Sequence, residues 1–341
     1  MTPTDSTPDE GPLGSSHAEL IAEIVHRLAP AHRAASAGSM SAATSGATSD
    51  SRGGTGGRPP EYRSQPRPAD PPRRLRAVPS WSARGSARES ARPVLVAVAH
   101  GSRDPAALAT ALRLLDQMRA LRPELDVRLA HLDLNEPRLD DVLGELPRSG
   151  RSEVVLVPLL LGRGFHVRID IPEQLARHPH LDAAVAAPLG PHPLLAEALQ
   201  VRLAEAGWNE PENVRLRRRE ARDAVVLAAS GSRDPASAKD AQTQALLLAA
   251  RLHVPVVPAF VSAAAPTVPQ AVAALCARGY RRIAVSSYFA APGDFARLAA
   301  AAAPWLVAGP LGAQEAMAAL VLERYDRAAA GHRAMASAHA V

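Results

Sequence analysis

From residue 93 onward, short apolar runs alternate with longer segments in which apolar residues recur every three or four positions. The run at 94–99 is apolar and partly β-branched, which is typical of a strand buried on both faces. The same criteria predict strands at 94–99, 126–132, 153–161 and 182–187, and helices at 106–121, 137–146, 168–177 and 192–206. Because alternating strands and helices indicate βαβ units, we expect a parallel sheet covered on both faces.

The pattern restarts near residue 223. Gly-Ser-Arg-Asp-Pro at 101–105 recurs at 231–235, 130 positions later, and Pro-Leu-Gly at 188–190 recurs at 310–312. The second copy predicts strands at 224–229, 254–261, 282–287 and 305–309, and helices at 236–251, 267–278, 294–303 and 313–329. We therefore expect an α/β protein with two homologous lobes, each a four-stranded parallel sheet flanked by helices. The expected lobes are 93–207 and 223–330, joined by a linker at 208–222, with a frayed end after 330.

Residues 1–91 lack this patterning and are dominated by Ser, Gly, Pro, Ala and Arg. Such a segment cannot bury enough apolar surface to offset chain entropy, so we expect a mostly disordered tail. Helical spacing of Leu20, Ile24 and Leu28 predicts a possible short helix at 16–29, with Ser16 as its N-cap. A structural or regulatory role, in which the tail recruits a partner, is a separate hypothesis.

Composition narrows the classes of protein. The chain is 47% hydrophobic but only 3% aromatic, so its core must rely on Ala, Val and Leu. The net charge of +5 permits acidic ligands, but no aromatic-interleaved basic patch or zinc-finger spacing points to nucleic acid. Cys276 is the only cysteine, which excludes an intrachain disulfide, and we expect it in the core. No apolar run of about 18 residues and no secretory signal are present, so we expect a cytoplasmic protein without membrane association.

Three residues with useful chemistry follow successive strands of the first lobe. His100 ends the first strand, Asp133 ends the second and His166 follows the third, and each of these residues lies 33 positions after the one before it. Because ligands bind at the carboxyl ends of parallel strands, we expect these side chains on one edge of the sheet. Two imidazoles and a carboxylate suit Fe, Co, Ni or Zn, and they also suit general base catalysis near neutral pH.

Each histidine also has a purely structural explanation. Taken singly, His100 could cap a helix and His166 could be an ordinary surface histidine. Their placement at successive strand ends favours a shared site. The Gly-Ser-Arg-Asp phrase lacks the lysine of a phosphate-binding loop, and no dinucleotide fingerprint follows a strand, so we expect no nucleotide cofactor.

These motifs carry a resemblance. His-Gly-Ser-Arg-Asp-Pro at 100–105 is similar to the CbiX/SirB group of sirohydrochlorin chelatases, as are Val-Pro-Leu-Leu-Leu at 157–161 leading to His166, and Asp-Ile-Pro at 170–172. The resemblance implies insertion of iron or cobalt into sirohydrochlorin, a tetrapyrrole rich in carboxylates, held in a cleft between two α/β lobes. By position, His100 and His166 match the family's active histidines, which would bind the incoming divalent metal and accept the pyrrole protons. The family usually has Glu where this chain has Asp133, so Glu136 is a second candidate carboxylate.

The second half departs from the pattern. Ungapped offsets from His100, Asp133, Glu136 and His166 lead to Ser230, Ser262, Ala265 and Asp294, so no histidine occupies the second set. The chain thus looks like a fused pair of lobes with one retired site, and we expect a monomer because both lobes are supplied internally.

Arginine suits the carboxylates of such a substrate because of its forked donors. Arg103, Arg163 and Arg168 are the candidates, and Gly162 and Gly164 would let the backbone approach a flat ligand. We expect a sirohydrochlorin chelatase that needs only its divalent metal substrate; the sequence does not choose between Fe²⁺ and Co²⁺, and our expectation is iron. The alternative is a non-catalytic metallochaperone or tetrapyrrole carrier of the same fold.

Overall fold

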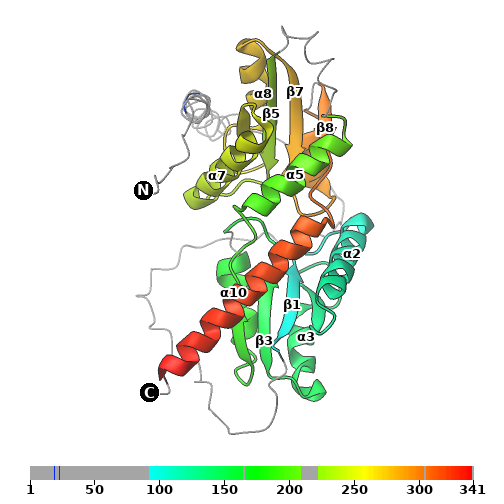
Figure 1. The fold of residues 1–341 in the computed structure, drawn as a ribbon, viewed down its shortest axis with the longest axis vertical. Coiled ribbons are helices and arrows are strands. Elements are labelled where there is room, and N and C mark those ends of the chain that lie inside the picture. The colour runs from blue at the N-terminus through cyan, green and yellow to red at the C-terminus, as the bar shows by residue number, and fades with distance from the viewer. Residues whose placement is uncertain are drawn as a thin grey trace, which may run out of the picture.

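The computed structural model describes residues 19, 23, 92–163, 166–208, 222–302 and 305–339, with only the backbone at 166 and 167. Two parallel sheets lie one beyond the other along the length of the molecule (Figure 1). In order, the first comprises β2 (Val127–His131), β1 (Val94–Ala99), β3 (Glu153–Pro158) and β4 (Asp182–Val185). The second comprises β6 (Val256–Phe260), β5 (Arg222–Ala229), β7 (Tyr280–Ser287) and β8 (Leu306–Ala308). The expected α/β fold with two four-stranded lobes is confirmed.

The helices follow the strands as expected, with small shifts at their ends. The first half holds α2 (Pro105–Leu121), α3 (Leu139–Glu145), the 3₁₀-helix η1 (Pro147–Ser149), the π-helix η2 (His166–Asp170), α4 (Ile171–Leu175) and α5 (Pro193–Glu205). The second holds α7 (Pro235–Leu252), α8 (Val268–Ala277), α9 (Asp294–Ala300) and α10 (Glu315–His339). The five residues from Val94 to Val98 are completely buried, which explains the continuous apolar run of β1.

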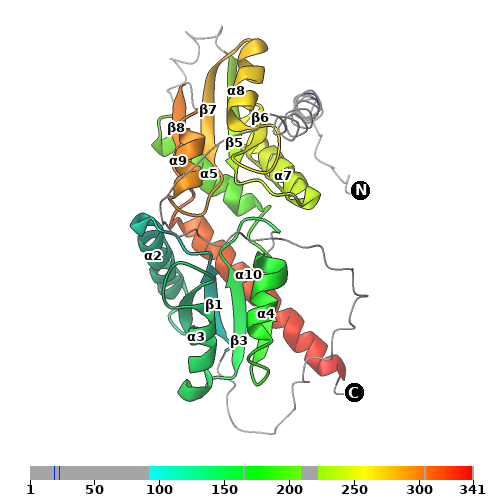
Figure 2. The same ribbon diagram turned by 180° about the vertical axis from the view of Figure 1, so that it is seen from behind.

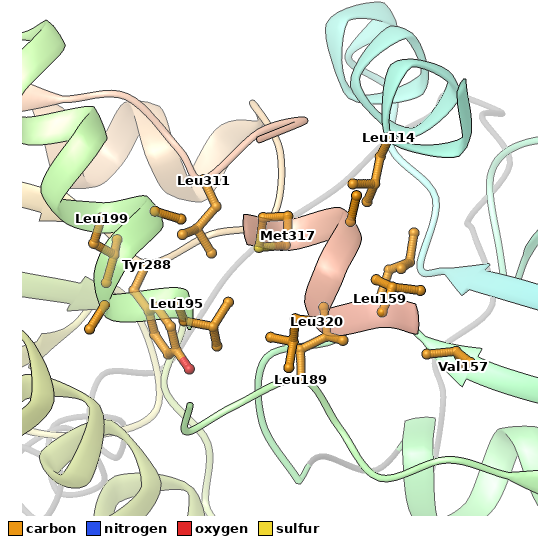
Figure 3. Packing of buried hydrophobic residues seen from close by; sticks show 14 of the residues in the cluster. Leu114, Val157, Leu159, Leu189, Leu195, Leu199, Tyr288, Leu311, Met317 and Leu320 are labelled. Carbon is orange, nitrogen blue, oxygen red and sulfur yellow. The ribbon is translucent and has the colours of Figure 1, made fainter. Parts of the chain in front are cut away.

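The last helix of each half packs against the other half. Helix α5 lies on α7 and β8 of the second lobe, whereas α10 lies on α2, β3 and β4 of the first (Figures 1 and 2). In Figure 3, Leu195 and Leu199 of α5 lie on the side of Tyr288 and Leu311, while Leu320 of α10 lies beside Leu189. The repeat boundaries at 207 and 223 therefore do not divide the molecule into its spatial lobes, because each lobe takes its final helix from the other half.

This exchange gives the two lobes a shared core. One large apolar cluster runs from β1 and β3 through α5 and α10 to β5, and includes Leu95, Val157, Leu195, Leu227 and Leu320. The opposite face of each sheet has a smaller cluster of its own. The interface between the lobes is thus as apolar as a domain interior.

The ends of the chain differ from expectation in one respect. The expectation of a frayed end after residue 330 was wrong. Helix α10 continues to His339, and the His332 imidazole pairs with Asp182 of β4. Near the other end, Glu19 and Glu23 are helical, and the Glu23 carboxylate lies 2.9 Å from the Arg278 guanidinium. The rest of the expected tail and helix at 1–91, and the linker at 209–221, lie outside the described residues.

Two further points concern composition. Cys276 is exposed on α8, so its expected place in the core was wrong; the face of α8 that packs inward carries Val268, Ala271 and Leu275 instead. Within the described part of the chain, no helix combines the length and the apolar character needed to cross a bilayer.

The repeated phrase forms the same turn in both lobes. Gly101 and Gly231 have φ of +100° and +86°, and a Cβ on either would lie 1.8 Å from the carbonyl oxygen of Asp133 or Ser262. After each glycine, Asp104 or Asp234 caps the next helix by accepting the N–H two residues on. Only glycine fits the first position, because that φ and that close approach both exclude a side chain.

We expect Gly101→Ala and Gly231→Ala to lower the free energy of unfolding by about 2–4 kcal/mol each, through backbone strain and displacement of the neighbouring strand end. Thermal and urea unfolding would measure this. Gly309→Ala is the matched control, since a Cβ there meets no atom within 4 Å. Wild-type stability of the Gly231 variant would show that the second turn is not a structural requirement.

Candidate active site between the two lobes

His100 stands immediately after β1, where its side chain is exposed. Its carbonyl accepts the N–H of Asp133 at 2.9 Å, which ties the ends of β1 and β2 together. Two residues after His100, the N–H of Ser102 donates a hydrogen bond of 2.6 Å to Asn135 Oδ1. Two of the three expected strand ends therefore meet, and they bring His100 beside Asp133.

The two candidate carboxylates share one cation. Arg138 lies 3.1 Å from Asp133 Oδ1 and 3.3 Å from Glu136 Oε1. The pKa of Asp133 is held below its usual value by the N–H of Leu134, which donates to the carboxylate at 2.8 Å, and by Arg138. Asp133 consequently remains ionised beside His100, and a negative charge there favours an approaching cation.

A cavity of about 850 Å³ opens between the lobes next to His100. Its first wall comes from the segment joining β1 to α2 and from α2 itself, and includes His100, Arg103 and Leu114. The facing wall comes from the segment joining β7 to α9 and from α9 itself, and includes Phe289, Phe295 and Arg297. The Arg297 guanidinium crosses to Asp104 at 2.6 Å and so links the two walls. This size is typical of a small-molecule site.

A smaller hollow of about 280 Å³ lies on the other side of His100. His100 and Asp133 line it together with Asp170, Glu173 and Arg177. His166 is the first residue of η2 and Asp170 the last, so the backbone carrying His166 reaches the same edge of the sheet. The side chain of His166, and all of Gly164, lie outside the described residues, and their roles stay predictions.

No group of three His, Cys, Asp or Glu side chains arranged to hold a metal occurs among the described side chains, which do not include that of His166. Any coordination by His100 would therefore be completed by His166 or by the arriving substrate.

The arginines divide into two sets. Arg103 is exposed and lines the cavity, as a carboxylate-binding residue should. Arg168 lies 3.1 Å from Asp234 of the second lobe, and Arg163 donates two hydrogen bonds, of 2.7 and 3.0 Å, to Asp240. These two arginines join the lobes in this structure, so Arg103 is the stronger candidate for the substrate.

A sequence model of the CbiX family matches residues 94–206 and 224–328. The chain belongs to the CbiX family. The resemblance noted in the sequence is confirmed, and each half of the repeat is one CbiX unit.

The CbiX relatives include proteins named for two metals. Sirohydrochlorin ferrochelatase of Bacillus subtilis (strain 168) is 28% identical over 180 residues, which cover 51% of this chain and 65% of that protein. Sirohydrochlorin cobaltochelatase of Priestia megaterium is 25% identical over 201 residues, 56% of this chain and 62% of that protein. The chain thus spans a little less than two thirds of these relatives. The solved structure of SirB from Bacillus subtilis with Fe³⁺ shares the fold, with a TM-score of 0.58 at 24% identity, over 71% of this chain and 98% of that one.

The second CbiX unit repeats the frame of the first without its histidines. Ser262 donates its N–H to the Ser230 carbonyl at 2.9 Å, as Asp133 does to His100. Arg297 pairs with Asp104 as Arg168 pairs with Asp234, which sets an offset of 129 for this segment. Counted with this offset, the position equivalent to His166 is Phe295, whereas the ungapped offset of 128 leads to Asp294.

Two kinds of residue at the CbiX site were missed from the sequence. His131 is 2% exposed and lines the cavity, and burial lowers the pKa of its imidazole. Phe289, Phe295 and Arg297 come from the second unit, for which the sequence had suggested no site residues. Pairing the repeats at the offset of 129 would have drawn attention to Phe295.

Removing the cation shared by the carboxylates should change how Asp133 titrates. We expect Arg138→Ala to raise the pKa of Asp133 toward its ordinary value, because the variant loses a charged donor while the N–H of Leu134 remains. A carboxyl-carbon NMR titration would measure the shift. Arg148→Ala, an exposed arginine further along, is the control. An unchanged Asp133 titration in Arg138→Ala would contradict the pairing.

Proposed function

We propose that this CbiX-family protein is a sirohydrochlorin chelatase that inserts Fe²⁺ into sirohydrochlorin. The observation that carries the proposal is the cavity of about 850 Å³ with His100 and Arg103 on one wall and an aromatic second wall. A carboxylate-rich, flat macrocycle needs both an apolar surface and cationic side chains, and this cavity offers both. The family and the names of its relatives support the choice of substrate.

Insertion exchanges two pyrrole protons for one divalent ion. Each pyrrole N–H bond breaks as its nitrogen bonds to the metal, and the protons leave through a base. An imidazole is the side chain suited to this near neutral pH, so His100, with His166, receives the role of metal carrier and proton acceptor. Asp133 is ionised and held by Arg138, so it supplies negative charge for the cation, with Glu136 next to it on the same arginine.

The choice of metal follows the expectation from sequence. Relatives named for iron and for cobalt match at similar identity, and imidazole and carboxylate ligands accept both ions. We propose iron, and therefore siroheme as the product. The ratio of the insertion rates with Fe²⁺ and Co²⁺ decides between them.

Other parts of the proposal follow from the fused arrangement. Each lobe is completed by a helix from the other half of the same chain, which favours a monomer. We propose that the protein acts in the cytoplasm, with no nucleotide cofactor, nucleic acid or membrane partner. Size measurement by light scattering would test the monomer directly.

A carrier of the metal or of the tetrapyrrole is the alternative function. The exposed position of His100 beside an open cavity suits delivery as well as catalysis. Turnover separates the two, because a carrier binds stoichiometrically and does not convert an excess of substrate.

The decisive variant is His100→Ala with His166→Ala. We expect it to lower metal insertion at least 100-fold while the fold survives, because the imidazoles supply both the metal ligands and the base. An anaerobic optical assay with sirohydrochlorin and Fe²⁺ or Co²⁺ would follow the loss of the metal-free spectrum. Ser230→Ala, at the equivalent of His100 in the second lobe, is the matched control and should keep full activity. Full activity in the double variant would overturn the roles proposed for the two histidines, and binding of the ring by the wild type without turnover would favour the carrier.

A further inference from the structure

The two lobes meet along two related seams, one beside His100 and the other beside Asp240. The residues at equivalent positions of the two seams differ in polarity. On the side of His100, Thr110, Leu114 and Leu159 line the open cavity. Their equivalents in the other half are Asp240, Gln244 and Tyr288, from offsets of 130 in the helices and 129 at the strand ends.

These three polar residues each reach across to the first half of the chain. Asp240 accepts two hydrogen bonds from Arg163, Gln244 Oε1 accepts the N–H of His192 at 2.9 Å, and the Tyr288 hydroxyl lies 3.5 Å from the Leu161 carbonyl. These polar contacts fill the seam beside Asp240, whereas the seam beside His100 keeps the cavity of about 850 Å³ even though the Arg297–Asp104 pair crosses it. The seam beside His100 therefore offers the space for a flat ring.

The open seam also has an unusual concentration of aromatic rings. The whole chain has four phenylalanines, and two of them, Phe289 and Phe295, line this cavity. Their ring centroids are 6.5 Å apart, and Phe295 is 44% exposed. A phenylalanine left this exposed beside a cavity indicates a surface that a ligand covers.

We propose that Phe289 and Phe295 form a platform for one face of the tetrapyrrole ring, with the opposite face turned toward His100. The inference rests on the proposed function and assigns the ring contact of the second lobe to two particular residues. Both line the wall that faces His100 and Arg103. The pair between Arg297 and Asp104 fixes the separation of the two walls.

A platform of this kind acts on binding and not on the chemical step. The rings touch the macrocycle equally before and during metal insertion, so their removal should raise KM and leave kcat unchanged. Loss of one aromatic contact together with its buried area should weaken ring binding about tenfold.

The test compares Phe295→Ala, Phe295→Trp and Leu298→Ala in the full chain. Leu298 lies three residues further along α9 and is 60% exposed, but it does not line the cavity. Its variant therefore removes an exposed apolar side chain from the same helix without changing the cavity wall. Quenching of the fluorescence of metal-free sirohydrochlorin gives the dissociation constant without metal, and the insertion assay gives KM and kcat. We expect about tenfold weaker binding and a raised KM for Phe295→Ala alone, with Trp restoring both.

Each result is informative. Wild-type binding by Phe295→Ala, or an equal loss in Leu298→Ala, would overturn the platform. A fall in kcat at unchanged KM would also overturn it, because that result assigns Phe295 to the chemical step. If the wild type binds the ring but inserts no metal, the proposed enzyme activity fails while the binding data still decide the platform; if it does not bind the ring, both fail.

Discussion

Burial of α5 and α10 against the sheet of the opposite half is the constraint on which the whole molecule depends. Helices α2 and α7 cover part of the apolar face of their own sheets, and the exchanged helix completes the cover. The two lobes consequently share one core and cannot be treated as independent domains. The cavity beside His100 follows from this arrangement, since the exchange brings the β1–α2 segment of one lobe against the β7–α9 segment of the other.

Within that frame the two halves have diverged in what they contribute. The first presents His100 and Asp133 at adjacent strand ends, and the second presents two phenylalanines and the arginine that reaches Asp104. The same backbone frame thus carries a histidine and a carboxylate on one side and an aromatic wall on the other. The pairs from Arg163 and Arg168 to the second lobe hold the segment before and after His166, so the second lobe also supports the segment that carries the second histidine.

Much of the fold could be predicted because its signals are local. Apolar runs marked the strands, and the steady offset of the repeat marked two lobes with retained turns. The helix exchange could not be predicted, because the apolar face of α5 has the same pattern whichever sheet it covers. The site was predicted as far as the adjacency of His100 and Asp133. The pairing of Arg168 with Asp234, the exposure of Cys276 and the place of Phe295 in the cavity wall depend on contacts between distant segments, which spacing alone does not encode.

The turn built on Gly101 and Gly231 has a consequence for how such sequences are compared. Four of its five residues serve the backbone in both lobes: the glycine avoids a carbonyl, the serine and aspartate order the helix start, and the proline begins the helix. The residue just before the phrase contributes its carbonyl to this frame in both lobes, but its side chain differs, histidine in the first lobe and serine in the second. A search with the phrase alone would therefore detect the architecture, and the preceding residue would have to be inspected to tell the copy with a histidine from the copy without one.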